Sequence, residues 1–166
     1  MPYDGRDIAN FILDICDEND RKITNLALQK IIYFCHVWSL IDFDRPLIKQ
    51  RFEAWQYGPV LPYVYREFKE FDASPITKRA QKLNIETGKK VVASIRFDET
   101  TEDWLKRVIN FYSRLSAGQL VELTHTENGP WAKVWKHESA VNPGMKIDDR
   151  EIKIYYSQVI PPYGIQ

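Results

Sequence analysis

The stretch Thr24–Ile41, TNLALQKIIYFCHVWSLI, is the segment that decides the fold. A stripe of apolar residues runs along it at helical spacing, and Leu26, Tyr33 and Phe34 widen this stripe until most of the helix surface is apolar. A helix that is apolar around most of its circumference is stable only when it is buried. Thr24 carries a side chain suited to cap the first turn. We therefore expect residues 24–41 to form the central helix of the core.

Further structure is predicted on both sides of this helix. Asp4 is suited to cap an amphipathic helix, and Ser116 with Gln119 has the form of a capping box. The pair Gly58-Pro59 interrupts the chain, and Pro59 is expected to hold Gly58 in ordinary extended backbone. The additional helices predicted by spacing and caps cover residues 5–18, 60–72, two segments within 100–124, 131–137 with Pro130 at the first helical position, and 149–158.

Two short apolar runs, residues 83–85 and 91–95, are joined across Gly88 and predict a small β-hairpin. The 166 residues suit one compact domain, and the sequence contains neither an internal repeat nor a linker. The predicted fold is therefore mainly α: a single domain over residues 1–160, with about six helices, a β-hairpin insertion near 83–96, and a C-terminal tail over 161–166.

The charge is balanced overall, with 23 basic and 23 acidic residues, which disfavours a globally basic nucleic-acid binder. Two windows are one-sided: residues 4–20 hold six acidic residues and one basic residue, and residues 78–96 hold six basic residues and one acidic residue. Each window is either an ordinary solvated surface or a patch that steers a charged partner. The candidate steering residues are Asp14, Asp17, Lys78, Arg79, Lys82, Lys89, Lys90 and Arg96.

The sequence offers little catalytic chemistry. Cys16 and Cys35 lie in apolar helical patterns, so we expect reduced core residues, with neither a redox pair nor a cysteine zinc site. His125 and Glu127, with His137 further on, could form an acid–base or metal cluster, but a histidine that closes a helix and packs on an aromatic neighbour is commoner. We therefore expect a protein that is not an enzyme and that needs no metal or cofactor.

Targeting and membrane-spanning patterns are missing from the sequence. The longest strictly apolar run is Ile31–Cys35, far below the ~20 residues that span a bilayer. We expect a cytoplasmic protein without a membrane partner. Nucleic-acid binding through residues 78–96 remains an alternative function, although the aromatic residues do not interleave with those charges as they do in proteins that stack bases.

Three segments together resemble the SocA-like antitoxin domain, also called the Panacea domain, in which GepA-type phage and mobile-element proteins are grouped. The segment Leu28–Trp38 is similar to the family's LQKLLYFA helix, the segment Phe52–Tyr65 to its AWxYGPVxPxVY signature, and the segment Leu120–Trp131 to its L…LTH…PW ending. The residues that carry the resemblance are Leu28, Lys30, Tyr33, Trp38, Trp55, Tyr57, Gly58, Pro59, Val60, His125, Pro130 and Trp131.

The resemblance implies an antitoxin that binds and neutralises a toxin encoded beside it, and secondarily an adaptor that presents the toxin to the ClpXP protease. The shared residues either determine the fold or bind the toxin. For a role in the fold, we expect Trp55 and Tyr57 to pack onto the helix 24–41, and His125 and Trp131 to close the core from the other end. Residues 73–97 lie outside the family motifs, so partner specificity is expected there.

Overall fold

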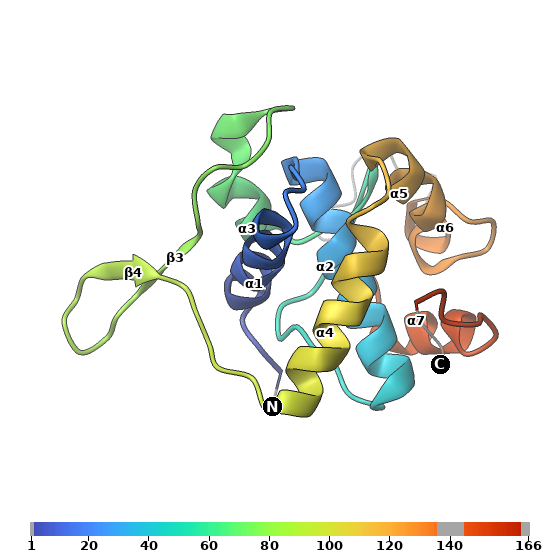
Figure 1. Cartoon of the computed structure of the whole chain (residues 1–166). Helices are drawn as coiled ribbons and strands as arrows, with labels where there is room; N and C mark the ends of the chain where they lie inside the picture. The colour runs from blue at the N-terminus through green and yellow to red at the C-terminus, as the bar shows by residue number, and fades with distance from the viewer. Residues whose placement is uncertain (1, 136–144, 164–166) are drawn as a thin grey trace.

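The computed structural model describes residues 2–135 and 145–163, and within them the fold is mainly α-helical, as the sequence predicts. Seven α-helices in these ranges enclose one core, and two short antiparallel hairpins join them (Figure 1). The helices are α1 (Gly5–Glu18), α2 (Asn25–Asp42), α3 (Pro62–Glu67), α4 (Glu99–Tyr112), α5 (Ala117–Thr124), α6 (Pro130–Trp135) and α7 (Asp149–Tyr156).

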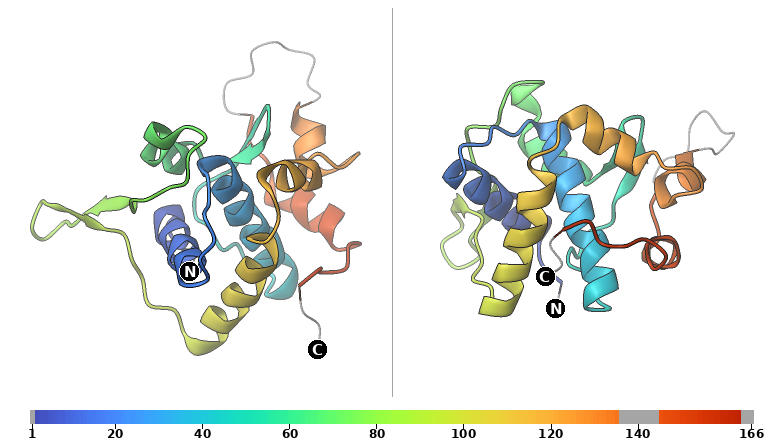
Figure 2. Two further views of the ribbon diagram at one scale, coloured as in Figure 1. Left: turned by 45° about the horizontal axis from the view of Figure 1, so that its top comes forward. Right: turned by 45° about the vertical axis from the view of Figure 1, so that its right-hand side comes forward.

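Helix α2 is the centre of the molecule. It contacts α1, α3, α4, α5 and α7, and the two views of Figure 2 show these helices arranged around it. Fifteen of its 18 residues are buried, which confirms the expected central helix. The Thr24 side chain accepts a hydrogen bond from the Ala27 backbone N–H at 3.3 Å, so the predicted cap is present as well.

The other helix starts follow local rules that the sequence displays. Asp4 accepts from the backbone N–H of Arg6 at the start of α1, and Asp148 does the same for α7. Ser116 and Gln119 form both bonds of the capping box that begins α5. Pro130 is the first residue of α6, where its missing N–H costs nothing. Helix α3 ends at Glu67 and a 3₁₀ turn over Lys69–Phe71 follows, so the predicted helix 60–72 is shorter and divided.

One β-hairpin is absent from the sequence-based prediction. Strand β1 (Glu53–Trp55) pairs with β2 (Gly58–Val60), and Gln56 and Tyr57 form the turn between them. The expectation of ordinary extended backbone at Gly58 is wrong, because its φ is 112°, a value that residues with a side chain rarely adopt. Glycine at this position lets the chain reverse within two residues.

The predicted hairpin in the basic segment is present, with its strands displaced from the expected positions. Strand β3 (Gln81–Leu83) pairs with β4 (Lys90–Val92), and this hairpin extends away from the helical body (Figures 1 and 2).

The last described residues differ from the predicted tail. Tyr163 is only 5% exposed, and its ring contacts the Trp38 ring. His137 lies outside the described residues.

Candidate functional site

The three segments that carry the family resemblance meet at one place in the structure. Helix α2 supplies Lys30, the β1–β2 hairpin supplies Gly58 and Pro59, and the end of α5 supplies Thr124. Lys30 Nζ donates to the Pro59 carbonyl at 3.0 Å. A Cβ atom at Gly58 would lie 2.6 Å from Thr124 Oγ1 and 2.7 Å from Lys30 Cε. The hairpin therefore approaches α2 and α5 so closely that a side chain at Gly58 would have to displace Lys30 or Thr124.

Lys30 is unusual because it is completely buried in the core helix. Its hydrogen bond to Pro59 is the one polar contact that the described residues give the amine. Burial lowers the pKa of Lys30 to about 7, so a large fraction of the side chain is uncharged near neutral pH. Buried amines without a carboxylate partner are rare, and this one joins the motif of α2 to the motif of the β1–β2 hairpin.

His125 and Trp131 lie beside this hairpin, with Trp131 buried in the core and His125 half-buried. His125 is the C-cap of α5, and its ring stacks on Trp131 with centroids 3.7 Å apart and planes at 6°. Trp131 Nε1 donates to the Trp55 carbonyl at 2.6 Å, which fixes α6 to strand β1. Burial, and secondarily the charge of Lys30, lowers the pKa of His125. The stack on Trp131 agrees with a structural role for this histidine, which stays a prediction.

A relay of amides, which the sequence analysis missed, fixes the chain after β2 to α2. The Leu61 backbone N–H donates to Gln29 Oε1, Gln29 Nε2 donates to Asn25 Oδ1, and Asn25 Nδ2 donates to the Tyr65 carbonyl, each at 3.0 Å. Asn25 and Gln29 are both buried. Two amide residues one turn apart in a mostly apolar helix were the available signal, because a buried amide needs partners.

The prediction that Tyr57 packs on α2 is wrong. Tyr57 is 57% exposed at the hairpin turn, and Trp55 is half-buried with its ring at 5.1 Å from the Tyr65 ring. These side chains line a groove of about 350 Å³, which we call the aromatic groove. Its lining residues are Asn25, Leu26, Trp55, Gln56, Tyr57, Val60, Tyr65 and Asp72. The remaining motif residues, such as Leu28, Tyr33 and Trp38, are buried in the core.

The two charged windows are not separate patches. Arg79 bonds to Asp14 at 2.9 Å and also to Asp17, and Lys82 bonds to Asp7 at 2.8 Å. These three contacts pair three of the six acidic residues of one window with two of the six basic residues of the other. The members of the basic window for which the described residues provide no ion pair are Lys89, Lys90 and Arg96, whereas Lys78 lies 3.6 Å from Glu70 on the surface.

The described candidate residues are not placed as catalysis or metal binding would require. Glu127 is exposed while the His125 ring is stacked, and burial raises the pKa of the Cys16 thiol to about 11. The described residues contain no group of three or more His, Cys, Asp or Glu side chains placed to hold a metal ion. None of the helices within the described ranges has the length and hydropathy needed to cross a lipid bilayer.

Fold and site define a small helical domain in which buried motif residues support an exposed aromatic groove. The family model for the SocA-like antitoxin, Panacea domain, matches residues 28–132. The curated protein Antitoxin SocA of Caulobacter vibrioides (strain NA1000 / CB15N) is 39% identical over 151 residues, which cover 90% of this chain and 80% of that protein. No solved structure matches the chain significantly. The chain belongs to the SocA-like antitoxin family, which confirms the resemblance that its three motifs show.

Proposed function

We propose that this protein is the antitoxin of a bacterial or phage toxin–antitoxin system and neutralises, by direct binding, a toxin encoded beside it. The observation that carries the proposal is the 39% identity to Antitoxin SocA over nine-tenths of the chain. The proposal places the protein in the cytoplasm, where an intracellular toxin would act. A protein that works by binding requires an accessible surface, and the aromatic groove supplies one.

The aromatic groove is the surface that we assign to the toxin. Tyr57 belongs to a family motif, yet its side chain is 57% exposed and contributes little to the core. Exposed tyrosine and tryptophan side chains are the commonest anchors of protein interfaces, because they bury a large area at small conformational cost. A toxin segment that inserts beside Tyr57 and Trp55 would form the centre of an interface of roughly 1,200–2,000 Å².

The test is to co-express the neighbouring open reading frame with this protein and to measure growth. We expect the frame alone to arrest growth and the wild-type protein to restore it. Tyr57→Ala should weaken binding of the purified toxin by about tenfold or more, as truncation of an interface anchor does. Ile154→Ala is the matched control, because Ile154 is 58% exposed, as Tyr57 is to a similar extent, but lies on helix α7 away from the hairpin turn. If the neighbouring frame is harmless, or is toxic but not rescued, the antitoxin proposal fails.

An adaptor role is the secondary form of the same proposal. In that form the bound toxin is presented to ClpXP, so neutralisation requires the protease as well as binding. The half-life of the toxin should then shorten when this protein is present and recover in a strain without ClpX. An unchanged half-life together with full rescue would leave direct occlusion as the mechanism.

The structure argues against the two alternative functions. Nucleic-acid binding through residues 78–96 would need phosphate-binding charges, but Arg79 and Lys82 already bind carboxylates of α1. Binding to random duplex DNA that falls steeply with salt would restore this alternative. An enzyme built on His125 and Glu127 would need an accessible imidazole, whereas the His125 ring lies against Trp131.

A further inference from the structure

Exposed aliphatic side chains are concentrated on the β3–β4 hairpin. Eleven large hydrophobic residues are exposed in the described part of the chain, and five of them lie within residues 83–95. Singly exposed apolar residues are normal on any protein, but a cluster on a projecting element marks a surface that another molecule covers. The five residues are Leu83, Ile85, Val91, Val92 and Ile95.

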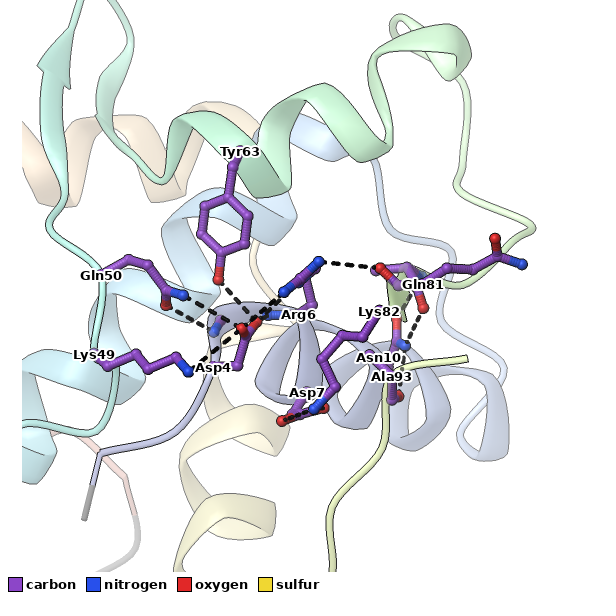
Figure 3. Close-up of polar contacts among 12 residues, drawn as sticks. Asp4, Arg6, Asp7, Asn10, Lys49, Gln50, Tyr63, Gln81, Lys82 and Ala93 are labelled. Atoms are coloured by element: carbon purple, nitrogen blue, oxygen red, sulfur yellow. Dashed lines mark hydrogen bonds and ion pairs between the residues drawn. The ribbon is translucent and has the colours of Figure 1, made fainter. Parts of the chain in front are cut away.

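The base of this hairpin is fixed to α1 by one buried amide. Asn10 Nδ2 donates to the carbonyls of Ala80 at 2.9 Å and Ala93 at 2.8 Å, and Asn10 Oδ1 accepts from the Ala80 N–H at 2.8 Å. The Ala93 N–H closes the base by donating to the Ala80 carbonyl at 2.9 Å. Asn10 is 3% exposed, so these bonds are protected from water. Figure 3 shows Asn10 between Ala93 and the start of β3.

Charged side chains strengthen this base. Arg6 Nη1 donates to the Gln81 carbonyl at 3.2 Å, and Lys82 bonds to Asp7 at 2.8 Å (Figure 3). Two-stranded hairpins are at best marginally stable alone, so these contacts are what hold this one in a fixed direction. A partner that binds it therefore loses little affinity to the ordering of the hairpin.

The register of the hairpin identifies its two faces. Lys82 is opposite Val91, and because Lys82 reaches Asp7 this pair lies on the face toward α1. Side chains alternate along a strand, so Leu83, Lys90 and Val92 lie on the opposite face, which we call the outer face. Leu83 is 62% exposed and Val92 is 55% exposed. The outer face therefore combines aliphatic side chains with a lysine that has no ion-pair partner among the described residues.

We propose that the β3–β4 hairpin is a second docking element, whose outer face inserts into an apolar groove bordered by carboxylates on the toxin. This inference rests on the proposed antitoxin function and adds a contact that the family motifs do not provide. Leu83 and Val92 supply the apolar contact, and Lys90 on the same face, with Lys89 beside it near the turn, supplies the charge that the carboxylates attract. Lysine at an interface rim speeds association more than it strengthens the final complex.

The charge pattern favours this occupant over two others. A nucleic acid would contact the lysines but would leave the aliphatic residues exposed, since base stacking requires aromatic side chains. A second copy of this chain would need an acidic surface, and much of the acidic window on α1 is already bonded to Arg79 and Lys82. An acidic, apolar groove on the toxin satisfies both kinds of side chain on the outer face.

The test compares variants of the two faces in binding to the purified toxin. We expect the double variant Leu83→Ser/Val92→Ser to lower affinity about tenfold or more, mainly through faster dissociation. Val91→Ser is the matched control, because it removes the same kind of side chain from the face toward α1 and should change affinity less than about twofold. Lys89→Glu/Lys90→Glu should slow association and reduce its salt dependence. Circular dichroism and thermal unfolding verify that each variant is folded.

The outcomes separate this inference from the function on which it rests. If the wild-type protein neither rescues growth nor binds the toxin, the antitoxin proposal fails, and the inference fails with it. If the wild-type protein binds but both double variants bind equally well, the docking role alone is overturned. An equal loss in Val91→Ser and in Leu83→Ser/Val92→Ser would overturn the outer face as the contact. If a double variant binds the toxin as tightly as the wild-type protein but has a different oligomeric state, the hairpin contacts a second copy of this chain instead. If it binds the toxin equally well but loses a salt-sensitive binding to DNA, the hairpin contacts nucleic acid instead.

Discussion

Replacement of the buried lysine, Lys30→Met, should stabilise the protein near neutral pH, and the gain should shrink as the pH rises. Methionine has a similar length and carries no charge, so it fills the same space in α2. The hydrogen bond from Lys30 to the Pro59 carbonyl is lost, at a cost of about 1 kcal/mol that does not depend on pH. The charge contribution is larger and does depend on pH.

The magnitude follows from the pKa of Lys30, which burial lowers from 10.5 to about 7. Each pKa unit corresponds to about 1.4 kcal/mol, so the lysine destabilises the folded chain by about 5 kcal/mol well below pH 7. Between pH 7 and pH 10.5 the unfolded chain binds the additional proton, so the stability of the wild-type protein rises with pH in this window. After the lost hydrogen bond is subtracted, Lys30→Met should be more stable by about 3 kcal/mol at pH 7 and about 1 kcal/mol at pH 9.

The assay is urea unfolding of both proteins at pH 6, 7, 8 and 9, followed by tryptophan fluorescence. Groups that do not interact with Lys30 titrate equally in both proteins, so the difference between the two free energies of unfolding reports Lys30 together with its smaller effect on the pKa of His125. Lys22→Met, which replaces an exposed lysine, controls for the loss of one positive charge. A difference that stays constant from pH 6 to pH 9, or a Lys30→Met protein that is less stable throughout, would refute the reasoning.

Three further predictions concern stability. Gly58→Ala forces a side chain into a positive φ and against Lys30, so thermal unfolding should show a loss of about 2–4 kcal/mol, and an unchanged midpoint would contradict the close approach. Asn10→Ala leaves backbone groups at the base of the hairpin unpaired, so stability should fall by about 1–3 kcal/mol and amide exchange across the hairpin should accelerate; unchanged exchange would show that Asn10 does not hold it. Burial opposes ionisation of Asp4, but hydrogen bonds, foremost from Arg6, outweigh it and hold the pKa of Asp4 well below 3.8. The Asp4 carboxylate therefore stabilises the folded chain above pH 3.8, and this stabilisation is lost as the pH falls. Asp4→Asn should therefore unfold with a weaker dependence on acid below about pH 4, and identical acid transitions would disprove this contribution.

Helices with a strong period and a cap could be predicted from the sequence almost to the residue. Helix α1 begins and ends where the spacing of Ile8 to Cys16 requires, and α2 differs from its predicted range by one residue at each end. Both depend on information within a few residues, namely a 3.6-residue apolar repeat and an oxygen-bearing cap. The β1–β2 hairpin lacks such information, because three-residue strands are too short to display an alternating pattern.

The sequence identified the residues of the candidate site but not how they lie relative to one another in space. The motifs identified Lys30, Gly58 and Trp131, yet spacing alone does not place residues from three segments at one point. The neutralisation of the acidic window by Arg79 was missed for the same reason, since Asp14 and Arg79 are 65 positions apart. The exposure of Tyr57 was also missed, because an aromatic residue in a conspicuous motif is usually a core residue.

The closed base of the β3–β4 hairpin makes this segment separable from the rest of the protein. Asn10, the Ala80–Ala93 hydrogen bond and the Lys82–Asp7 ion pair complete the contacts where the chain leaves and rejoins the core, so the residues beyond them do not have to support the helices. Each doubling of loop length costs only about 0.6 kcal/mol of closure entropy. Residues 83–90 can therefore change in length and sequence at little cost to folding, whereas Lys82 is needed to pair with the buried Asp7. The same helical scaffold can in this way be given hairpins for different partners, by recombination in nature or by grafting in the laboratory.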